Sequence, residues 1–233
     1  MRMTTLRLVT YNVHKCRGID WRVRPARIVR VLREIDADVI AIQEILAGQS
    51  AYIAAELGMS HVFGIARQHA GQDYGNAVLS RFPIVSSTTQ DLTIRRREPR
   101  ICLRADIAVE HTMLCLFAVH LGTSYLERRQ QVAKLMSAEV LGSTALSGPR
   151  VVVGDFNEWT RGLVTRTLSH HFESADIAYH LKRTRTYPGI LPIMHLDHVY
   201  YDPELKLEGM HLHRSGTALR ASDHLPLVAE FVV

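Results

Sequence analysis

The sequence predicts an α/β or α+β sandwich, because it contains many short apolar segments and only a few segments with helical spacing. About ten segments are rich in Val and Ile and are flanked by Gly, Pro or Asp, which is typical of strands. A few longer segments repeat their apolar residues with the period of a helix. Both kinds occur in each half of the chain, which disfavours a helical bundle or a pure β-barrel.

The strands are expected from the apolar runs alone, taken in chain order. They cover residues 7–13, 38–43, 61–66, 76–80, 102–109, 113–119, 151–154, 198–201, 205–213 and 225–233.

Three helices are expected between these strands. The first begins at Pro25, a residue favoured in the first helical turn, and carries one apolar face. The second covers about 50–57 and the third about 125–141, and a glycine follows each of them. A shorter helix is expected after Trp159.

Length and charge are those of a single soluble domain, expected to span residues 1–233. The chain has 233 residues and a formal net charge of +5, from 28 basic and 23 acidic residues. Such a length buries a sizeable core in one domain. The mild basic excess is equally compatible with an anionic partner and with a soluble protein that is merely basic.

The three cysteines point to a reducing compartment. Cys16, Cys102 and Cys115 form no C-x-x-C pair, so neither a disulfide framework nor a structural zinc site is expected. No signal peptide and no apolar run of membrane-spanning length is visible. We therefore expect a cytoplasmic protein with no transmembrane segment and no obligate protein partner.

Polar side chains stand at the ends of the predicted core strands. They are Asn12, Gln43, Glu44, His120, Asp155, Asn157, Asp197, His198, Asp223 and His224. A single Asn or Asp in such a place is usually a turn former. Together, however, they offer carboxylate, amide and imidazole groups without a cysteine, and oxygen donors of this kind suit Mg²⁺ or Mn²⁺ better than zinc.

The motifs that carry these residues resemble those of the endonuclease/exonuclease/phosphatase family. They are T-Y-N ending at Asn12, Q-E at 43–44, G-N-A-V-L-S-R-F-P at 75–83, His120, G-D-F-N at 154–157, L-D-H at 196–198 and S-D-H-L-P at 222–226. Pancreatic deoxyribonuclease, apurinic endonucleases, inositol polyphosphate 5-phosphatases and neutral sphingomyelinases belong to that family. The resemblance implies a four-layer α/β/β/α sandwich of two mixed β-sheets flanked by helices.

The resemblance also implies a metal-dependent hydrolase of phosphoesters, most simply phosphodiesters. Glu44 would be the principal ligand of Mg²⁺ or Mn²⁺, with Asn12 beside it and Asp223 completing the shell directly or through water. Magnesium keeps several waters, so a sparse protein shell is reasonable.

The remaining roles concern the attacking water and the phosphate. Asp197 would orient His224, and either Asp155 or His224 would be the base, an alternative that the sequence leaves open. Asn157 would hold a phosphate oxygen, and His120 would donate to the phosphate or protonate the leaving group.

Three further residues are candidates for substrate binding. Arg97 or Arg100, from the R-R-R-E-P-R segment, would hold the phosphate through a planar guanidinium. The competing interpretation is a solvated loop. Asn76 would line the same cleft, and a structural role in a turn is equally good.

The substrate class stays open at this stage. The arginine segment and the net charge favour DNA or RNA, whereas no interleaved aromatic platform for bases is visible. Phospholipid head groups or small phosphate esters are the alternative. A catalytically silent binding module of the same fold is a third possibility, disfavoured because every expected acid and His is present.

Overall fold

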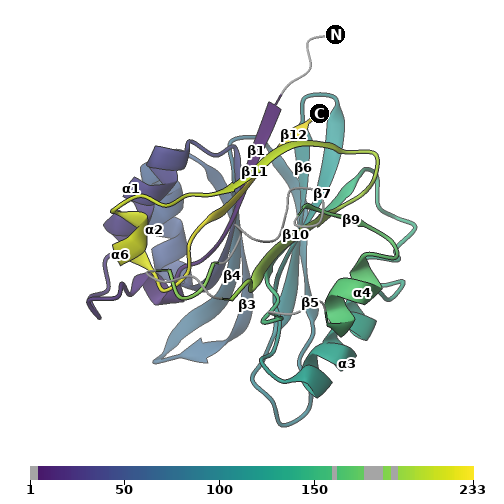
Figure 1. Cartoon of the computed structure of the whole chain (residues 1–233), viewed down its shortest axis with the longest axis horizontal. Helices are drawn as coiled ribbons and strands as arrows, with labels where there is room; N and C mark the ends of the chain where they lie inside the picture. The colour runs from purple at the N-terminus through teal and green to yellow at the C-terminus, as the bar shows by residue number, and fades with distance from the viewer. Residues whose placement is uncertain (1–4, 159–161, 176–185, 190–193) are drawn as a thin grey trace.

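The computed structural model describes residues 5–158, 162–175, 186–189 and 194–233, which form two β-sheets packed face to face (Figure 1). The first sheet has the order β11-β12-β1-β2-β4-β3 and the second the order β5-β6-β7-β8-β10-β9. The strands of the first sheet are β1 (Thr5–Asn12), β2 (Val39–Leu46), β3 (Ser60–His69), β4 (Gln72–Ser80), β11 (Lys206–Leu212) and β12 (Leu227–Val232). Those of the second are β5 (Ile84–Asp91), β6 (Ile101–Val109), β7 (Thr112–His120), β8 (Arg150–Asp155), β9 (Glu173–Ser174) and β10 (Asp197–Tyr201).

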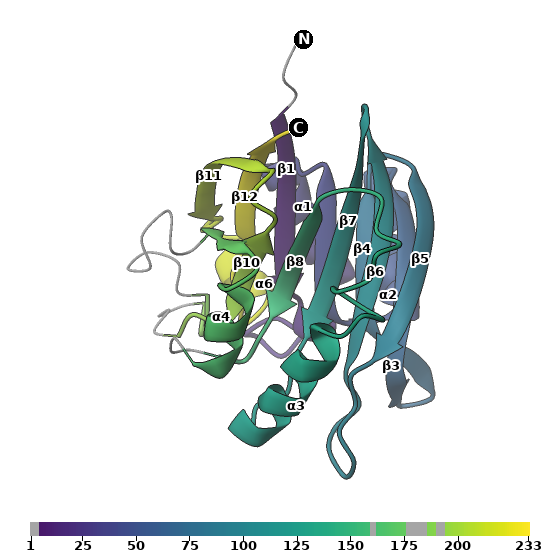
Figure 2. The same cartoon turned by 90° about the vertical axis from the view of Figure 1, so that its right-hand side faces the viewer.

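Helices cover the outer faces of the two sheets. They are α1 (Pro25–Ile35), α2 (Ala47–Leu57), α3 (Tyr125–Leu135), α4 (Leu163–Leu168), the short α6 (Ala218–Ala221) and the 3₁₀ turn η1 (His14–Cys16). Figure 2 shows α3 and α4 on the side of the second sheet, away from α1. The expected four-layer sandwich of mixed sheets is confirmed. None of the helices in the described part of the chain is both long and apolar enough to cross a membrane.

Three apolar clusters hold the layers together. The first lies between the sheets and includes Leu8, Val153 and Phe231. The second joins the first sheet to α1 and α2, and the third joins the second sheet to α3 and α4. Each sheet is thus buried on both faces, which explains why its central strands are almost continuously apolar.

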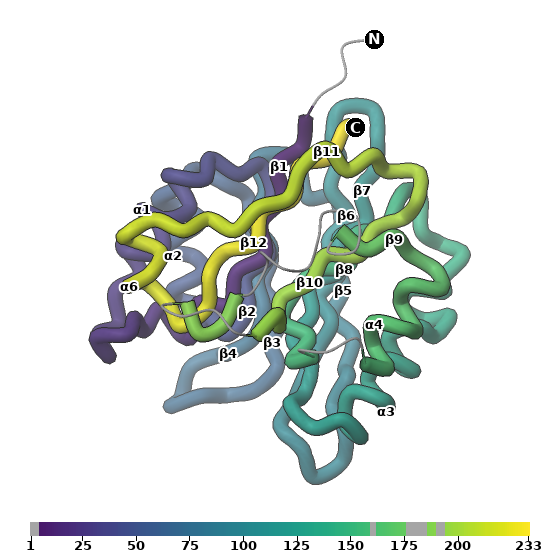
Figure 3. The backbone as a smooth tube through the Cα atoms, viewed as in Figure 1, coloured from purple at the N-terminus to yellow at the C-terminus, as the bar shows by residue number. Residues whose placement is uncertain are grey.

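The register of the strands brings the polar strand ends together. β1 and β2 run parallel, with Asn12 beside Gln43, and β7 and β8 run parallel, with His120 beside Asp155. Asp197, at the start of the antiparallel β10, also pairs with Asp155. Figure 3 shows β12 beside β1. The two strands are antiparallel, so the residues just before β12, which include Asp223 and His224, lie at the same end of the sheet as Asn12.

The expected helices are found with changed lengths. α1 begins at Pro25 as predicted, and α2 begins at Ala47, earlier than expected. The third helix was predicted too long, because α3 ends at Leu135 and residues 137–142 form turns. The turn lets Leu141 donate its backbone N–H to Leu135 O (3.1 Å) and bury its side chain in the third cluster. The helix expected after Trp159 is α4; residue 159 lies outside the described residues.

Three features of the strands were not predicted, the first being the two-residue strand β9. β5 is a mostly exposed, polar edge strand, so its sequence lacks the apolar pattern used to find the others. β2 does not end at Gln43 but continues to Leu46, with a register shift between Ile42 and Ile45. Gln43 and Glu44 therefore lie within a bulge of β2 rather than after the strand.

Candidate active site

The bulge in β2 sets the direction of Glu44. Its backbone φ is +55°, in the left-handed region that residues with a Cβ seldom adopt. Bulges re-aim side chains next to functional sites. Here the Glu44 carboxylate accepts a hydrogen bond from Asn12 Nδ2 at 3.0 Å.

Asn12 joins the two sheets at the floor of the site. Its Nδ2 also donates to Asp155 Oδ2 at 3.0 Å, while its Oδ1 accepts the backbone N–H of His14 at 3.1 Å. The amide therefore turns N–H groups toward both carboxylates. A direct metal bond through Oδ1 requires that oxygen to leave the His14 backbone.

Two basic residues that the sequence did not single out lie beside the predicted metal ligands. Lys15 Nζ is 3.6 Å from Glu44 Oε2, and His14 Nδ1 is 3.3 Å from Asp223 Oδ2. The only sequence feature that could have identified them is their position two and three residues after Asn12. Asp223 is itself anchored near β1, because the neighbouring Ser222 Oγ donates to Asn12 O at 2.8 Å.

Glu44 and Asp223 are both held in the charged form. Burial raises the pKa of Glu44, but His120, Asn12, Lys15 and His14 together lower it to about 2. Burial also raises the pKa of Asp223, and the hydrogen bond and charge of His14 lower it below the usual range. The two carboxylates offer hard anionic oxygens, as Mg²⁺ or Mn²⁺ requires.

His224 and Asp197 form a buried pair on the other wall. His224 Nδ1 and Asp197 Oδ2 are 2.8 Å apart, and both side chains are almost fully buried. Burial lowers the pKa of His224, but Asp197, Asp155 and Asp223 outweigh it and raise the pKa to about 10. Its Nε2 lies 3.7 Å from Asp155 Oδ2. The imidazole is therefore a cation at neutral pH.

His120 is in the opposite state. Burial and the Arg100 guanidinium lower its pKa to about 4, so its ring is neutral at neutral pH. Arg100 Nη1 lies 2.8 Å from its Nδ1 and 3.1 Å from its Nε2. Glu98 Oε2 accepts from Arg100 Nη2 at 3.0 Å, which fixes the guanidinium from outside. The two His residues of this site thus have different protonation states at neutral pH, as is common where one group acts as an acid and another as a base.

Asp155 and Asn157 follow β8 at the centre of the site. Asp155 Oδ1 accepts the backbone N–H of Asn157 at 2.9 Å, and Asn157 has a left-handed φ of +50°. Asn157 Nδ2 donates to Leu121 O at 2.9 Å. These bonds hold the Asp155 carboxylate in place between the two imidazoles.

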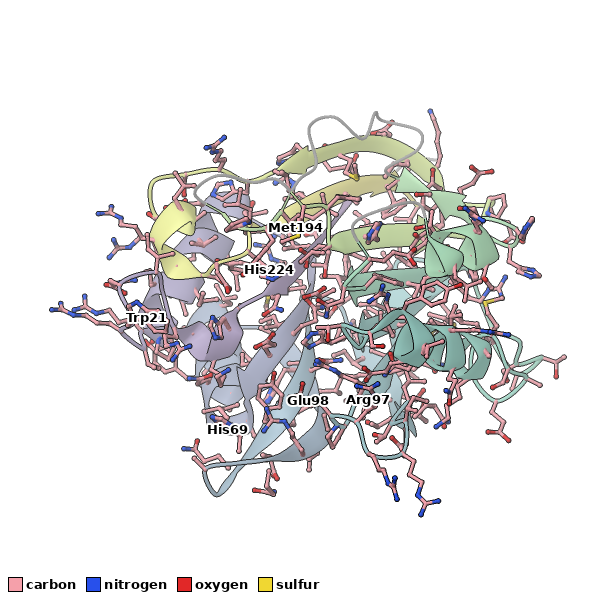
Figure 4. The ribbon with its side chains drawn as sticks, turned by 60° about the horizontal axis from the view of Figure 1, so that its bottom comes forward. Trp21, His69, Arg97, Glu98, Met194 and His224 are labelled. Atoms are coloured by element: carbon pink, nitrogen blue, oxygen red, sulfur yellow. The ribbon has the colours of Figure 1, made fainter. Side chains whose placement is uncertain are left out.

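A cavity of about 340 Å³ lies over these groups. Its described lining combines predicted site residues with new polar and apolar neighbours: Glu44, Arg100, His120, Thr123, Arg128, Asp155, Asn157, Tyr187, Met194, Leu196, Asp223 and His224. Of these, Thr123, Arg128 and Met194 were missed by the sequence reasoning, whereas Tyr187 is an aromatic residue of a predicted loop that could stack on a base or sugar. Figure 4 shows Met194 close to His224, and the Tyr187 ring lies 5.0 Å from the His224 ring.

Four predicted site residues lie outside that lining. Asn12 and Asp197 are buried behind it and act on it through the hydrogen bonds described above. Asn76 is buried and donates to Ala118 O at 3.3 Å. Arg97 is exposed beside Glu98 (Figure 4). Of the two candidate arginines, Arg100 is the one brought to the cavity.

Comparisons with known proteins agree with this arrangement. A sequence model of the endonuclease/exonuclease/phosphatase family matches residues 9–224. The uncharacterized protein YbhP of Escherichia coli K12 is 26% identical over 249 residues, covering 97% of this chain and 96% of that protein.

Two solved structures share the fold at low identity. A mannosyl-6-phosphatase of Bacteroides thetaiotaomicron has a TM-score of 0.81 and 19% identity, covering 98% of this chain and 100% of that one. TDP2 of D. rerio, solved with a single-strand DNA product, has a TM-score of 0.77 and 15% identity, covering 98% of this chain and 99% of that one.

Proposed function

The chain belongs to the endonuclease/exonuclease/phosphatase family, and from that premise we propose that it hydrolyses phosphodiesters with a bound divalent cation, Mg²⁺ or Mn²⁺. The observation that carries the proposal is the convergence of two charged walls on one cavity. One wall holds the anionic Glu44 and Asp223, and the other holds Asp155 between a charged His224 and a neutral His120.

Glu44 and Asp223 would hold the cation, with Asn12 orienting Glu44. The donor set fits, because both carboxylates are ionised and both line the same cavity. The cation would neutralise charge on a phosphate oxygen. A second group, Asp155, Asp197 and His224, also has ligand atoms within 4.8 Å of one another. Its 2.8 Å bond between His224 Nδ1 and Asp197 Oδ2 is that of a charged dyad, so we assign it to proton chemistry.

Asp155 accepts the proton of the attacking water in this proposal. His224 already carries its proton at neutral pH and therefore acts as a cation beside the phosphate, held by Asp197. Of the two bases that the sequence left open, the proposal therefore takes Asp155.

Arg100 and Asn157 bind the phosphoryl oxygens. Arg100 presents its guanidinium to the cavity and keeps His120 neutral, so His120 donates a hydrogen bond from an N–H rather than releasing a full proton. The hydrogen bond from the charged Arg100 guanidinium to a phosphate oxygen is about twice as strong as one between neutral groups.

Two substrate classes remain in this proposal. Nucleic acid is favoured by the basic charge of the chain. A phospholipid is favoured by the apolar side of the cavity, formed by Tyr187, Met194 and Leu196. One of the solved structures named above is a mannosyl-6-phosphatase and the other holds a single-strand DNA product, so the shared fold does not choose between substrate classes.

A substrate panel tests the proposal. Single-stranded DNA, RNA, an abasic duplex, bis-p-nitrophenyl phosphate and phospholipids are incubated with Mg²⁺, with Mn²⁺ or with chelator. The expected result is hydrolysis that requires the cation and is lost in Glu44→Gln. Hydrolysis that is unaffected by both the chelator and this substitution would remove Glu44 and the cation from the mechanism.

A further inference from the structure

A group of exposed apolar side chains lies on the loop between η1 and α1 and on the neighbouring helix α2. Trp21 is 74% exposed, Val23 56% and Ile19 39%, and Tyr52 of α2 is 42% exposed. Single exposed apolar residues are ordinary, but several on one surface mark an interaction site. Residues 17–24 together with Arg30 and Tyr52 are called the tryptophan surface below.

The loop that carries Trp21 is held in one shape, so the exposure is not that of a frayed segment. Arg17 and Val23 form a β-bridge, and Trp21 N donates to Gly18 O at 2.9 Å. Gly18 packs so closely that a Cβ there would meet Arg220 O at 2.2 Å. Trp21 has a left-handed φ of +62°, a strained conformation that the surrounding bonds maintain.

Arginines surround this apolar group. Arg22, Arg24 and Arg30 are exposed, and among the described residues only Arg22 has a carboxylate, that of Asp20, close enough to interact with it. A fourth arginine, Arg27, forms an ion pair, with its Nη2 2.8 Å from Asp20 Oδ2. A hollow of about 440 Å³ is lined by Arg24, Arg27, Arg30 and Tyr52, among others. The tryptophan surface therefore combines apolar side chains with unneutralised positive charge.

A chain of contacts connects the tryptophan surface to the catalytic cavity. The Arg17 guanidinium lies 4.6 Å from the Trp21 ring centroid, and Arg17 Nη2 is 3.0 Å from His14 Nε2. His14 in turn contacts Asp223 at 3.3 Å. Figure 4 shows Trp21 at the left margin of the view in which His224 lies near the centre. Trp21 is thus linked through Arg17 and His14 to Asp223, a residue of the cavity lining.

We propose that the tryptophan surface docks the protein on an anionic phospholipid bilayer. Trp is favoured at the interface between water and lipid, and each arginine near an anionic leaflet adds attraction. The aliphatic side chains of Ile19 and Val23 favour a bilayer over a nucleic acid as the binding partner. They gain from burial among acyl chains, whereas they offer neither a π-face to a base nor a donor to a phosphate.

The proposal deepens the phospholipid alternative and rests on the proposed function for the reaction that follows docking. Docking itself needs neither turnover nor the cation. It is therefore measured on the full chain with chelator present, by sedimentation with vesicles. One set contains phosphatidylglycerol and phosphatidylcholine, and the other contains phosphatidylcholine alone.

The expected result is binding to the anionic vesicles that weakens with salt. Trp21→Ala should weaken it about tenfold or more, the order set by burying one large apolar side chain. Arg24→Glu with Arg30→Glu should weaken it at least as much. Trp21→Phe, which keeps an apolar ring, should retain most of the binding.

Two variants far from the cavity serve as controls. Val85 is a similarly exposed apolar residue near the start of β5, where Ile84 pairs with Ile107 at the far end of β6 from Arg100. Lys206 is exposed at the start of β11, where it pairs with Val232. Val85→Ala and Lys206→Glu should bind vesicles as the wild type does, and all variants should unfold at the wild-type temperature.

Three results would overturn the proposal. They are absence of wild-type binding to anionic vesicles, equal binding by Trp21→Ala and the control variants, and binding to a single-stranded oligonucleotide in place of vesicles. Hydrolysis of soluble bis-p-nitrophenyl phosphate is measured on the same preparations with Mg²⁺. Failure of docking and failure of catalysis are thereby read separately.

Discussion

Replacing Asp197 by Asn should destabilise the protein in a way that depends on pH. In the folded protein the pKa of His224 is about 10, against an ordinary value of 6.5, with burial opposing and Asp197 leading the charges that raise it. Because the folded pKa is above the unfolded one, the stabilisation is complete below about pH 6.5 and is lost as pH rises toward about 10. At about 1.4 kcal/mol per pH unit, the full difference is on the order of 5 kcal/mol.

The amide carbonyl introduced by this substitution still accepts from a neutral His224, so the variant loses the charge interaction rather than the hydrogen bond. Breaking a buried ion pair typically costs about 3–5 kcal/mol. We expect Asp197→Asn to lower the free energy of unfolding by roughly that amount at pH 6 and by far less near pH 10. A pH-independent cost of about 1–3 kcal/mol from the buried amide adds to both values.

Urea unfolding of the metal-free protein at several pH values between 6 and 10 measures this difference, and NMR titration of the His224 ring gives its pKa directly. Glu34→Gln is the control, because His213 Nε2 and Glu34 Oε2 form a pair of similar length, 2.9 Å, at the surface. That change should cost about 1 kcal/mol or less. A wild-type His224 that titrates near 6.5, or a loss that is the same at pH 6 and pH 10, would refute the reasoning.

Three further predictions concern single groups of the site. Glu44→Gln should lower turnover about 10²-fold or more and abolish the rise in unfolding temperature caused by Mg²⁺ or Mn²⁺, measured by calorimetry. Arg100→Gln should raise the pKa of His120 above about 4, because the second-largest cause that lowers it is removed while burial remains; NMR titration of the ring checks this. Tyr11→Phe should leave stability unchanged or raise it by up to about 1 kcal/mol in urea unfolding. The reason is that Tyr11 Oη is buried without a hydrogen-bond partner among the described residues.

The fold was predictable where burial is periodic. Pro25 and the apolar face after it gave α1, and runs such as the one before Asp155 gave the central strands. The edge strand β5 was missed because an exposed edge does not need apolar residues. The end of α3 at Leu135 was missed because tertiary packing of Leu141, rather than local propensity, turns the chain there.

The candidate site was predictable where a motif stands at a strand end. Asp155, His120 and Asp197 lie side by side because the register of three strands aligns them. Other contributors depend on geometry that a sequence does not display. Lys15 reaches Glu44 only through the left-handed backbone of η1, and Glu44 reaches the cavity only through the bulge in β2.

The protonation states also required the structure. Two His residues with the same ordinary pKa become a cation and a neutral ring, because carboxylates outweigh burial at His224, whereas burial and Arg100 outweigh the carboxylates at His120. The same dependence on three-dimensional neighbours applies to Tyr187 and Met194, which pair across a β-bridge beside the cavity.

The most direct test of the central claim is the rate of bis-p-nitrophenyl phosphate hydrolysis by the wild type and by Asp155→Asn, each with Mg²⁺, Mn²⁺ or chelator. The account predicts hydrolysis by the wild type only when the cation is present, and a loss of about 10²-fold or more in the variant, the usual scale for a proton-transfer group. A wild-type rate that is unchanged by chelator, or a variant as fast as the wild type, would contradict it.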